Sequence, residues 1–281
     1  MKPALVILAG GLAARFGGDK QIAPLGAAGR FLFEYACYDA MQAGFEKVFV
    51  ITRSQMKAQI NVQLLRWMHP SRFEIIIQEQ SRSKPWGTAH ALHFLAGRWA
   101  GPFLVLNADD YYGADICVRA KELLERGIQQ AALLFELAPT LSPNGPVARG
   151  LCQVEQNFLQ DIEEVLRIER VGTSIQDEQG RVLAPDTLIS MNAWLFQASF
   201  LTDLTAHVQQ FLSDNAQSET AEVYLPKVVQ ELIQKAQLQV SVSTMPAEWF
   251  GLTYAADLAL AKQKITDLEK GVYPTAFSAW I

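Results

Sequence analysis

The sequence predicts an α/β protein with a doubly wound, mainly parallel sheet, and three observations support this. Five short apolar runs in the first half have the length of buried strands, and helical patterns separate them. Gly44 and Gly127 follow two of the helical patterns, where helices commonly end. Strands that alternate with helices over short links form a parallel sheet covered on both faces, which is a Rossmann-like arrangement.

The predicted strands are Ala4–Leu8, Val48–Thr52, Phe73–Gln78, Phe103–Leu106 and Ala131–Leu137. The predicted helices between them span about residues 31–43, 54–67, 88–99 and 115–126. In such a sheet a ligand binds at the carboxyl ends of the strands. We therefore expect the loops that begin at Ala9, Gln78 and Asn107 to converge on one crevice.

The second half of the chain has a different pattern. Residues 138–190 carry prolines, glycines and short apolar segments, which predicts a β-rich lobe with long connections. Helical patterns return at about residues 199–213, 221–236 and 254–270. No internal repeat or low-complexity linker divides the chain, so we expect a single domain over residues 1–281 with two halves, 1–137 and 138–281.

Composition limits the classes of partner. The chain has 281 residues, half of them hydrophobic, which is enough for a full core. A net charge of −5 argues against a nucleic-acid partner. Cys37, Cys117 and Cys152 show no paired spacing, so they indicate buried thiols in a reducing compartment. No uninterrupted apolar stretch is long enough to span a bilayer, and we expect a cytoplasmic protein without a membrane partner.

The segment LAGGLAARFGGDKQIAPLG, residues 8–26, predicts a phosphate-binding loop. Gly10 and Gly11 follow a predicted strand, where they allow a sharp turn that brings backbone N–H groups against an anion. Arg15 and Lys20 add two cations that can neutralise a triphosphate and the charge on departing pyrophosphate. A glycine pair alone would indicate only a tight turn, and the two cations favour the phosphate site.

Two other phosphate-binding loops fit less well. A P-loop is excluded because no Gly-Lys-Ser/Thr follows at the required spacing. A dinucleotide-binding turn would need an acidic ribose ligand near the end of the second strand, where Thr52 and Arg53 stand.

A carboxylate pair follows the strand predicted at Phe103–Leu106. A strand that ends in aspartate at a crevice can present that carboxylate to Mg²⁺, and we assign the metal to Asp109. For Asp110 we leave two roles open, a supporting partner of the metal site or a helix cap. His90 and His93 lie three residues apart without a third ligand nearby in sequence, which indicates packing histidines.

These motifs resemble the sugar-phosphate nucleotidyltransferases, also called nucleotide-sugar pyrophosphorylases, and in style the UTP–glucose-1-phosphate uridylyltransferases. The family signature is matched at Leu8, Ala9, Gly10, Gly11, Arg15 and Lys20, with Ala13 in place of its third glycine. The block Gly87-Thr88-Ala89 and the preceding Gln78 resemble the elements that bind the ribose and the base. The resemblance implies a GT-A-type fold, Mg²⁺ as cofactor, and a nucleotide-binding half at residues 1–137.

The resemblance continues into residues 138–281 as an acceptor-binding half. The positions that match its acceptor-binding motifs are Gly150, Glu164, Asn192 and Glu222. Val165 and Leu166 replace the Lys-Pro that follows the glutamate in the family, and Arg167 and Arg170 are the candidates for the missing cation. Gly251 stands where the family has a second metal-binding aspartate after Trp249, and Glu248 and Asp257 are the candidate substitutes.

The implied reaction needs no protein nucleophile. A phosphate oxygen of a sugar 1-phosphate attacks the α-phosphorus of a nucleoside triphosphate, and pyrophosphate departs. The resemblance assigns Arg15 to the pyrophosphate, Lys20 to the α-phosphate and the incoming phosphate, and Asp109 to Mg²⁺. It assigns the nucleoside to Leu8, the backbone of Ala9–Gly11, Gln78, Gly87 and Thr88.

Three alternatives stay open at this point. The first is a cytidylyltransferase that acts on phosphocholine or a polyol phosphate, and the second is a non-catalytic regulatory protein that binds nucleotide-sugars. A nicotinamide-dependent oxidoreductase comes third. The sequence does not name the base or the sugar. The apolar, aromatic segment GVYPTAFSAWI indicates docking on the protein's own surface or at the interface of a homo-oligomer.

Overall fold

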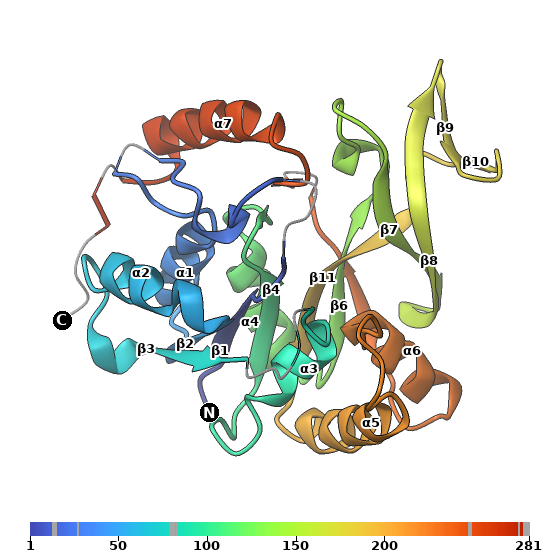
Figure 1. Ribbon diagram of the computed structural model, residues 1–281, viewed down its shortest axis with the longest axis horizontal. Coiled ribbons are helices and arrows are strands. Elements are labelled where there is room, and N and C mark those ends of the chain that lie inside the picture. The colour runs from blue at the N-terminus through green and yellow to red at the C-terminus, as the bar shows by residue number, and fades with distance from the viewer. Residues whose placement is uncertain are drawn as a thin grey trace.

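The computed structural model describes residues 1–12, 16–26, 28–78, 82, 84–246, 249–274 and 276–277 (Figure 1). Its α-helices are α1 (Phe33–Gln42), α2 (Ser54–Leu64), α3 (Thr88–His93), α4 (Ile116–Glu125), α5 (Phe200–Asp214), α6 (Leu225–Gln234) and α7 (Asp257–Gly271). Its strands are β1 (Ala4–Ala9), β2 (Lys47–Thr52), β3 (Phe73–Ile77), β4 (Phe103–Asn107), β5 (Asp110–Tyr111), β6 (Ala131–Glu136), β7 (Val147–Glu155), β8 (Phe158–Val171), β9 (Ser174–Asp177), β10 (Val182–Leu183), β11 (Leu188–Phe196), β12 (Ser241–Thr244) and β13 (Phe250–Gly251).

The α/β prediction is confirmed. The main sheet has the order β10-β9-β8-β12-β6-β11-β4-β1-β2-β3, with β7 paired to β8 and β11. Strands β4, β1, β2 and β3 pair in parallel, so their carboxyl ends meet at one edge. Residues from both halves contribute strands to this single sheet, and the division at residue 137 stays a prediction.

The sheet was predicted to be mainly parallel, but it is mixed, because the strands of the second half pair mostly in the antiparallel sense. Strand β11 lies between β4 and β6 and pairs with both in the antiparallel sense. It follows the antiparallel strands β7–β10, which need no helical crossover, and therefore enters the sheet in the opposite direction. The β-rich prediction for residues 138–190 is confirmed by these strands, which lie at the right of Figure 1.

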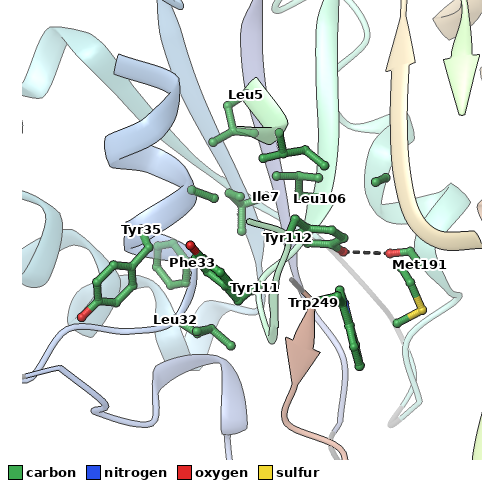
Figure 2. Close-up of a cluster of buried hydrophobic side chains, with 14 of the residues drawn as sticks. Leu5, Ile7, Leu32, Phe33, Tyr35, Leu106, Tyr111, Tyr112, Met191 and Trp249 are labelled. Atoms are coloured by element: carbon green, nitrogen blue, oxygen red, sulfur yellow. Dashed lines mark hydrogen bonds between the residues drawn. The ribbon is translucent and has the colours of Figure 1, made fainter. Parts of the chain in front are cut away.

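Two apolar layers cover the faces of the sheet. Alternate residues of β1 contribute to different layers, Leu5 and Ile7 to one and Ala4 and Val6 to the other. The first layer also takes side chains from α1, α2, α4 and α7, and the second takes them from α3, α5 and α6. Figure 2 shows part of the first layer, where the hydroxyl of Tyr112 donates to the Met191 carbonyl over 2.8 Å.

Helix boundaries confirm some signals and correct others. Gly44 and Gly127 adopt φ of 86° and 80° just beyond α1 and α4, as expected of C-terminal caps. Helix α3 ends at His93 instead of residue 99, with Gly97 at a φ of 76°. Helix α6 starts at Leu225 instead of residue 221, because Pro226 has no N–H to donate and fits only the first helical turn.

The C-terminal segment docks on the protein's own surface. The Phe277 ring stacks on Tyr38 at a centroid distance of 4.3 Å, and the Arg30 guanidinium lies 3.9 Å from its centre. Tyr273 donates to Asp39 over 2.7 Å. In the part of the chain that the structure describes, no helix combines the length and apolar character needed to cross a membrane.

Candidate active site

A cavity of about 300 Å³ opens at the carboxyl ends of β1, β3 and β4. The predicted nucleotide-site residues that line it are Leu8, Gly10, Gly11, Lys20, Gln78, Gly87, Thr88 and Asp109. The loops after three separate strands therefore converge on one crevice, as expected. Ala9 is buried at the end of β1. Arg15 lies outside the described residues, as does Ala13.

Lys20 and Asp109 meet in this cavity although 89 positions separate them (109 − 20). They form an ion pair, and Lys20 Nζ also donates to the carbonyl of Leu252 over 2.8 Å. Burial opposes the charge on Lys20, but the Asp109 carboxylate outweighs it and raises the pKa of the ammonium group. The structure thus holds one cation and one carboxylate side by side at the crevice.

Asp110 is buried next to this pair. Its Oδ2 accepts hydrogen bonds from Asn107 Nδ2 over 2.9 Å and from the Tyr112 hydroxyl over 3.2 Å. Burial, together with the adjacent charge of Asp109, raises its pKa. Asp110 lies in β5, while α4 has Asp115 at its N-cap, so the helix-cap role considered for Asp110 is wrong.

The environment of Gly251 explains why that position is a glycine. Strand β13 pairs with β5 so that Gly251 lies opposite Asp110. A Cβ atom added to Gly251 would collide with Oδ1 of Asp110 and would also lie only 2.8 Å from the Trp249 ring. The Asp110 carboxylate therefore occupies the space into which a side chain at position 251 would project.

Of the two candidate second ligands, Asp257 uses both carboxylate oxygens in hydrogen bonds within the protein. Asp257 Oδ2 accepts the backbone N–H groups of Thr253 and Tyr254, over 2.9 Å and 2.7 Å. Its Oδ1 accepts from Ser142 and Asn144, so Asp257 stabilises the turn before α7. Glu248 lies outside the described residues.

Gln78 is held by its neighbours. Its Nε2 donates to His90 Nδ1 over 3.1 Å and to the Gly87 carbonyl over 3.4 Å. A Cβ at Gly10 would collide with its Oε1. The amide is therefore fixed between the glycine-rich loop and the start of α3, and His90 is a packing histidine that accepts from it, as predicted.

The buried His90 leads to a pH-dependent prediction. Burial, with smaller contributions from His93 and Arg82, lowers the pKa of His90 from 6.5 to about 4. Between these two pH values the unfolded chain binds a proton that the folded protein does not, so the stability of the wild type falls as the pH falls. His90→Asn keeps an acceptor without titrating. From pH 7 to pH 5 we expect the variant to lose on the order of 1 kcal/mol less unfolding free energy than the wild type.

Urea unfolding at both pH values measures this difference, with the exposed His69→Asn as the matched control. An equal pH dependence for the wild type and His90→Asn would contradict the assignment.

The backbone conformation at position 87 requires a glycine. It adopts a φ of 100° and a ψ of −179°, a region open in practice only to glycine, at the N-cap of α3. A Cβ there would also collide with the Val223 carbonyl oxygen. Thr88 Oγ1 accepts the backbone N–H of Leu225 over 2.9 Å, so this turn joins the starts of α3 and α6.

We therefore expect Gly87→Ala to lower the free energy of unfolding by about 3 kcal/mol. Gly97→Ala is the matched control, because Gly97 also has a positive φ but nothing lies within 4 Å of its added Cβ. The control should lose only about 1 kcal/mol. Chemical denaturation compares the two, and equal losses would mean that the contact with Val223 is unimportant.

A second cavity of about 420 Å³ adjoins the first. The residues that line both cavities are Thr88, Asn107, Asp109 and Tyr224. Three predicted acceptor residues, Gly150, Glu164 and Asn192, line the second cavity. Asp109 therefore stands at the junction of the two spaces.

Asn192 lies at a bulge in β11 with a φ of 61°. Its Nδ2 donates to Asn107 Oδ1 over 2.8 Å, and its Oδ1 accepts from the Trp194 indole over 2.9 Å. Together with the bond from Asn107 to Asp110, these contacts link the second cavity to the carboxylate pair.

Other predicted acceptor residues lie elsewhere. Glu222 lines the first cavity, where it pairs with Lys84 at 2.5 Å and accepts from the Tyr224 hydroxyl at 2.7 Å. Arg167 is exposed and pairs with Glu169 at 3.0 Å, and Arg170 is exposed as well, so neither lines the second cavity.

Two cationic side chains in the cavity walls were not predicted from the sequence. Lys84 lines the first cavity, and its position three residues before Gly87 could have indicated this. Arg149 lines the second cavity, directly before Gly150, and only its place beside a predicted acceptor residue hinted at a role.

Comparison with known proteins agrees with this geometry. Residues 5–133 match the family model of the MobA-like NTP transferase domain. No curated protein matches the chain significantly in sequence. A Bacillus anthracis protein assigned as a glucose-1-phosphate thymidylyltransferase shares the fold with a TM-score of 0.66 at 14% identity, over 95% of this chain and 96% of that one. An inositol-1-phosphate CTP transferase from T. maritima gives 0.66 at 14%, over 96% and 98%.

These comparisons show the fold of the chain and the similarity of residues 5–133 to an NTP transferase domain. This similarity agrees with the resemblance recognised from the glycine-rich loop.

Proposed function

We propose that the protein transfers a nucleotidyl group from a nucleoside triphosphate to a sugar 1-phosphate and releases pyrophosphate. The nucleotide occupies the first cavity, and the phosphorylated acceptor occupies the second. The observation that carries this proposal is the junction of the two cavities at Asp109, with Lys20 paired to it. Two substrates bound in these spaces would have their reacting groups next to one cation and one metal-binding carboxylate.

The carboxylate pair fits Mg²⁺, the metal that NTP transferases generally use. Mg²⁺ prefers oxygen ligands and is often bound through one or two carboxylates together with substrate phosphates. Asp109 lines both cavities, and Asp110 offers a second carboxylate in the second one.

The chain's own residues position the reaction and stabilise charge. A phosphate oxygen of the acceptor forms the new bond to the α-phosphorus, and the bond to the departing pyrophosphate breaks with its electron pair on the pyrophosphate. Lys20 stabilises the negative charge on the α-phosphate, and Arg15 is assigned to the pyrophosphate. Asp109 and Asp110 would hold Mg²⁺, which would neutralise phosphate charge when bound.

The nucleoside is held by fixed groups. Backbone N–H groups near Ala9–Gly11 face the phosphates, and the oriented amide of Gln78 contacts the base. Gly87 and Thr88 support the ribose. Gly150, Glu164 and Asn192 contact the acceptor in the second cavity, while Glu222 acts from the first.

Pyrophosphate release tests the proposal. UTP, dTTP, CTP and GTP are each combined with glucose 1-phosphate, inositol 1-phosphate and phosphocholine in the presence of Mg²⁺. We expect release with a sugar 1-phosphate. Release with phosphocholine or inositol 1-phosphate but not with glucose 1-phosphate would favour the cytidylyltransferase alternative. Nucleotide-sugar binding without any release would favour the regulatory protein.

A further inference from the structure

We propose that Arg149 binds the phosphate group of the acceptor and thereby restricts the acceptor to phosphate esters. This rests on the proposed function, because it gives a role to one side chain in the wall of the second cavity. Arg149 lies in β7, one residue before Gly150.

The Arg149 side chain is buried without an acidic partner. Only 7% of the residue is exposed, and no Asp or Glu among the described residues lies within 4.0 Å of its guanidinium. Nε and one terminal nitrogen donate to the side chain and carbonyl of Thr140, and the other terminal nitrogen donates to the Ala148 carbonyl over 2.8 Å. These neutral acceptors use three of its five N–H groups and leave its charge uncompensated.

An uncompensated buried cation is costly unless an anion joins it. Burial lowers the pKa of Arg149 to about 10, and the more distant carboxylates of Asp110 and Glu164 oppose that shift. The group therefore stays protonated near neutral pH. A phosphate that enters the second cavity would supply the missing counter-ion, and the planar guanidinium suits two phosphate oxygens at once.

A second orphan donor belongs to the same wall. Trp249 is 7% exposed and lines the second cavity, and its indole N–H has no hydrogen-bond partner in the described structure. The Arg149 guanidinium lies 5.0 Å from the centre of a Trp249 ring, which fixes the cation against an aromatic face. The ring of Trp249 therefore backs the guanidinium, and the buried indole N–H beside it supplies no counter-charge.

The position of Arg149 also suits this role. It lies opposite Val165 of β8, and the next pair along the ladder is Gly150 opposite Glu164. Opposed residues of antiparallel strands project from the same face of the sheet. Arg149 therefore supplies a cation on the face from which a basic residue at position 165 would project.

The test compares two arginines of the same antiparallel β7–β8 pair. Arg149→Met should raise the KM for the accepted phosphate ester, among glucose 1-phosphate, inositol 1-phosphate and phosphocholine, at least about 10-fold. The KM for the nucleoside triphosphate should change less than about twofold, because Arg149 does not line the first cavity. Arg167→Met, the exposed control, should leave both values unchanged.

Two further variants separate binding from folding. Arg149→Lys keeps the positive charge but not the planar guanidinium group that can bind two phosphate oxygens, so it should give an intermediate KM for the acceptor. Arg149→Met combined with Val165→Lys returns a cation to the same face and should recover part of the loss. Thermal unfolding reports whether each variant is folded. If Arg149→Met does not fold, the KM values of Arg149→Lys test the proposal instead.

An unchanged acceptor KM in a folded Arg149 variant would overturn the inference while leaving the proposed function intact. An equal rise in the KM for both substrates would overturn it as well. Failure of the proposed function would give a different result, because the wild type would then release no pyrophosphate with any of these acceptors.

Discussion

Lys20→Ala is expected to lower kcat at least about 100-fold, as the loss of a preorganised charge at the reacting phosphate does. Lys20 is held by the Asp109 carboxylate and the Leu252 carbonyl, so its ammonium group is positioned before substrate binds. Because Asp109 raises its pKa, the side chain is fully charged at neutral pH. A charge that needs no reorganisation stabilises the transition state more than one that must be recruited from solvent.

The measurement is pyrophosphate release at saturating substrates, with thermal unfolding to show that the variant is folded. Lys47→Ala is the matched control, because Lys47 also forms an ion pair, at 2.8 Å with Glu74, but does not line either cavity. It should leave kcat unchanged. Near-normal turnover in a folded Lys20→Ala protein would rule out the assigned role.

The loss of Lys20 also leaves Asp109 and Asp110 without their nearest cation. Two adjacent carboxylates repel each other, so metal binding to Lys20→Ala should not weaken even though turnover falls. If Lys20→Ala lost metal binding as well as turnover, the variant would disturb the site as a whole.

The nucleotide-binding part of the site could be predicted because each of its motifs lies within one short segment of the sequence. A buried strand followed by Gly10 and Gly11, or by Asp109, ends at the crevice in any parallel sheet, and the sequence shows each strand directly. The same pattern of strands and helices allowed the parallel strands β1–β4 to be predicted, with bounds that differ from the structure by one residue at most.

The fold of residues 138–281 depends on strand pairings that cannot be recognised from any short segment of the sequence. The apolar run of β11 predicts a strand but not its antiparallel entry between β4 and β6, which follows from the strands before it. Arg149 gains its position from the pairing with Val165, and the bulge near it shifts the register. Arg149 is buried and Arg167 is exposed, and this difference, which decides their roles, is not recorded by the residues next to them in sequence.

Gly251→Ala is expected to weaken Mg²⁺ binding at least about 10-fold, although it removes no ligand. The added Cβ would collide with Asp110 Oδ1 and displace the carboxylate that we assign to the metal beside Asp109. Calorimetric titration of Mg²⁺ with a non-hydrolysable nucleoside triphosphate measures this. Gly271→Ala is the control, since nothing lies within 4 Å of a Cβ at that position.

Moving the carboxylate across the strand pair gives the sharper test. Asp110→Ala alone should lose affinity for Mg²⁺ as Gly251→Ala does. Combined with Gly251→Asp, it places a carboxylate on the opposed residue, next to the space that Asp110 vacates, and should recover part of the affinity after a small shift of the Trp249 ring. Additive losses in the double variant would show that the two positions do not share one ligand site. Recovery would mean that this chain supplies from β5 the second carboxylate that the related motif supplies from position 251.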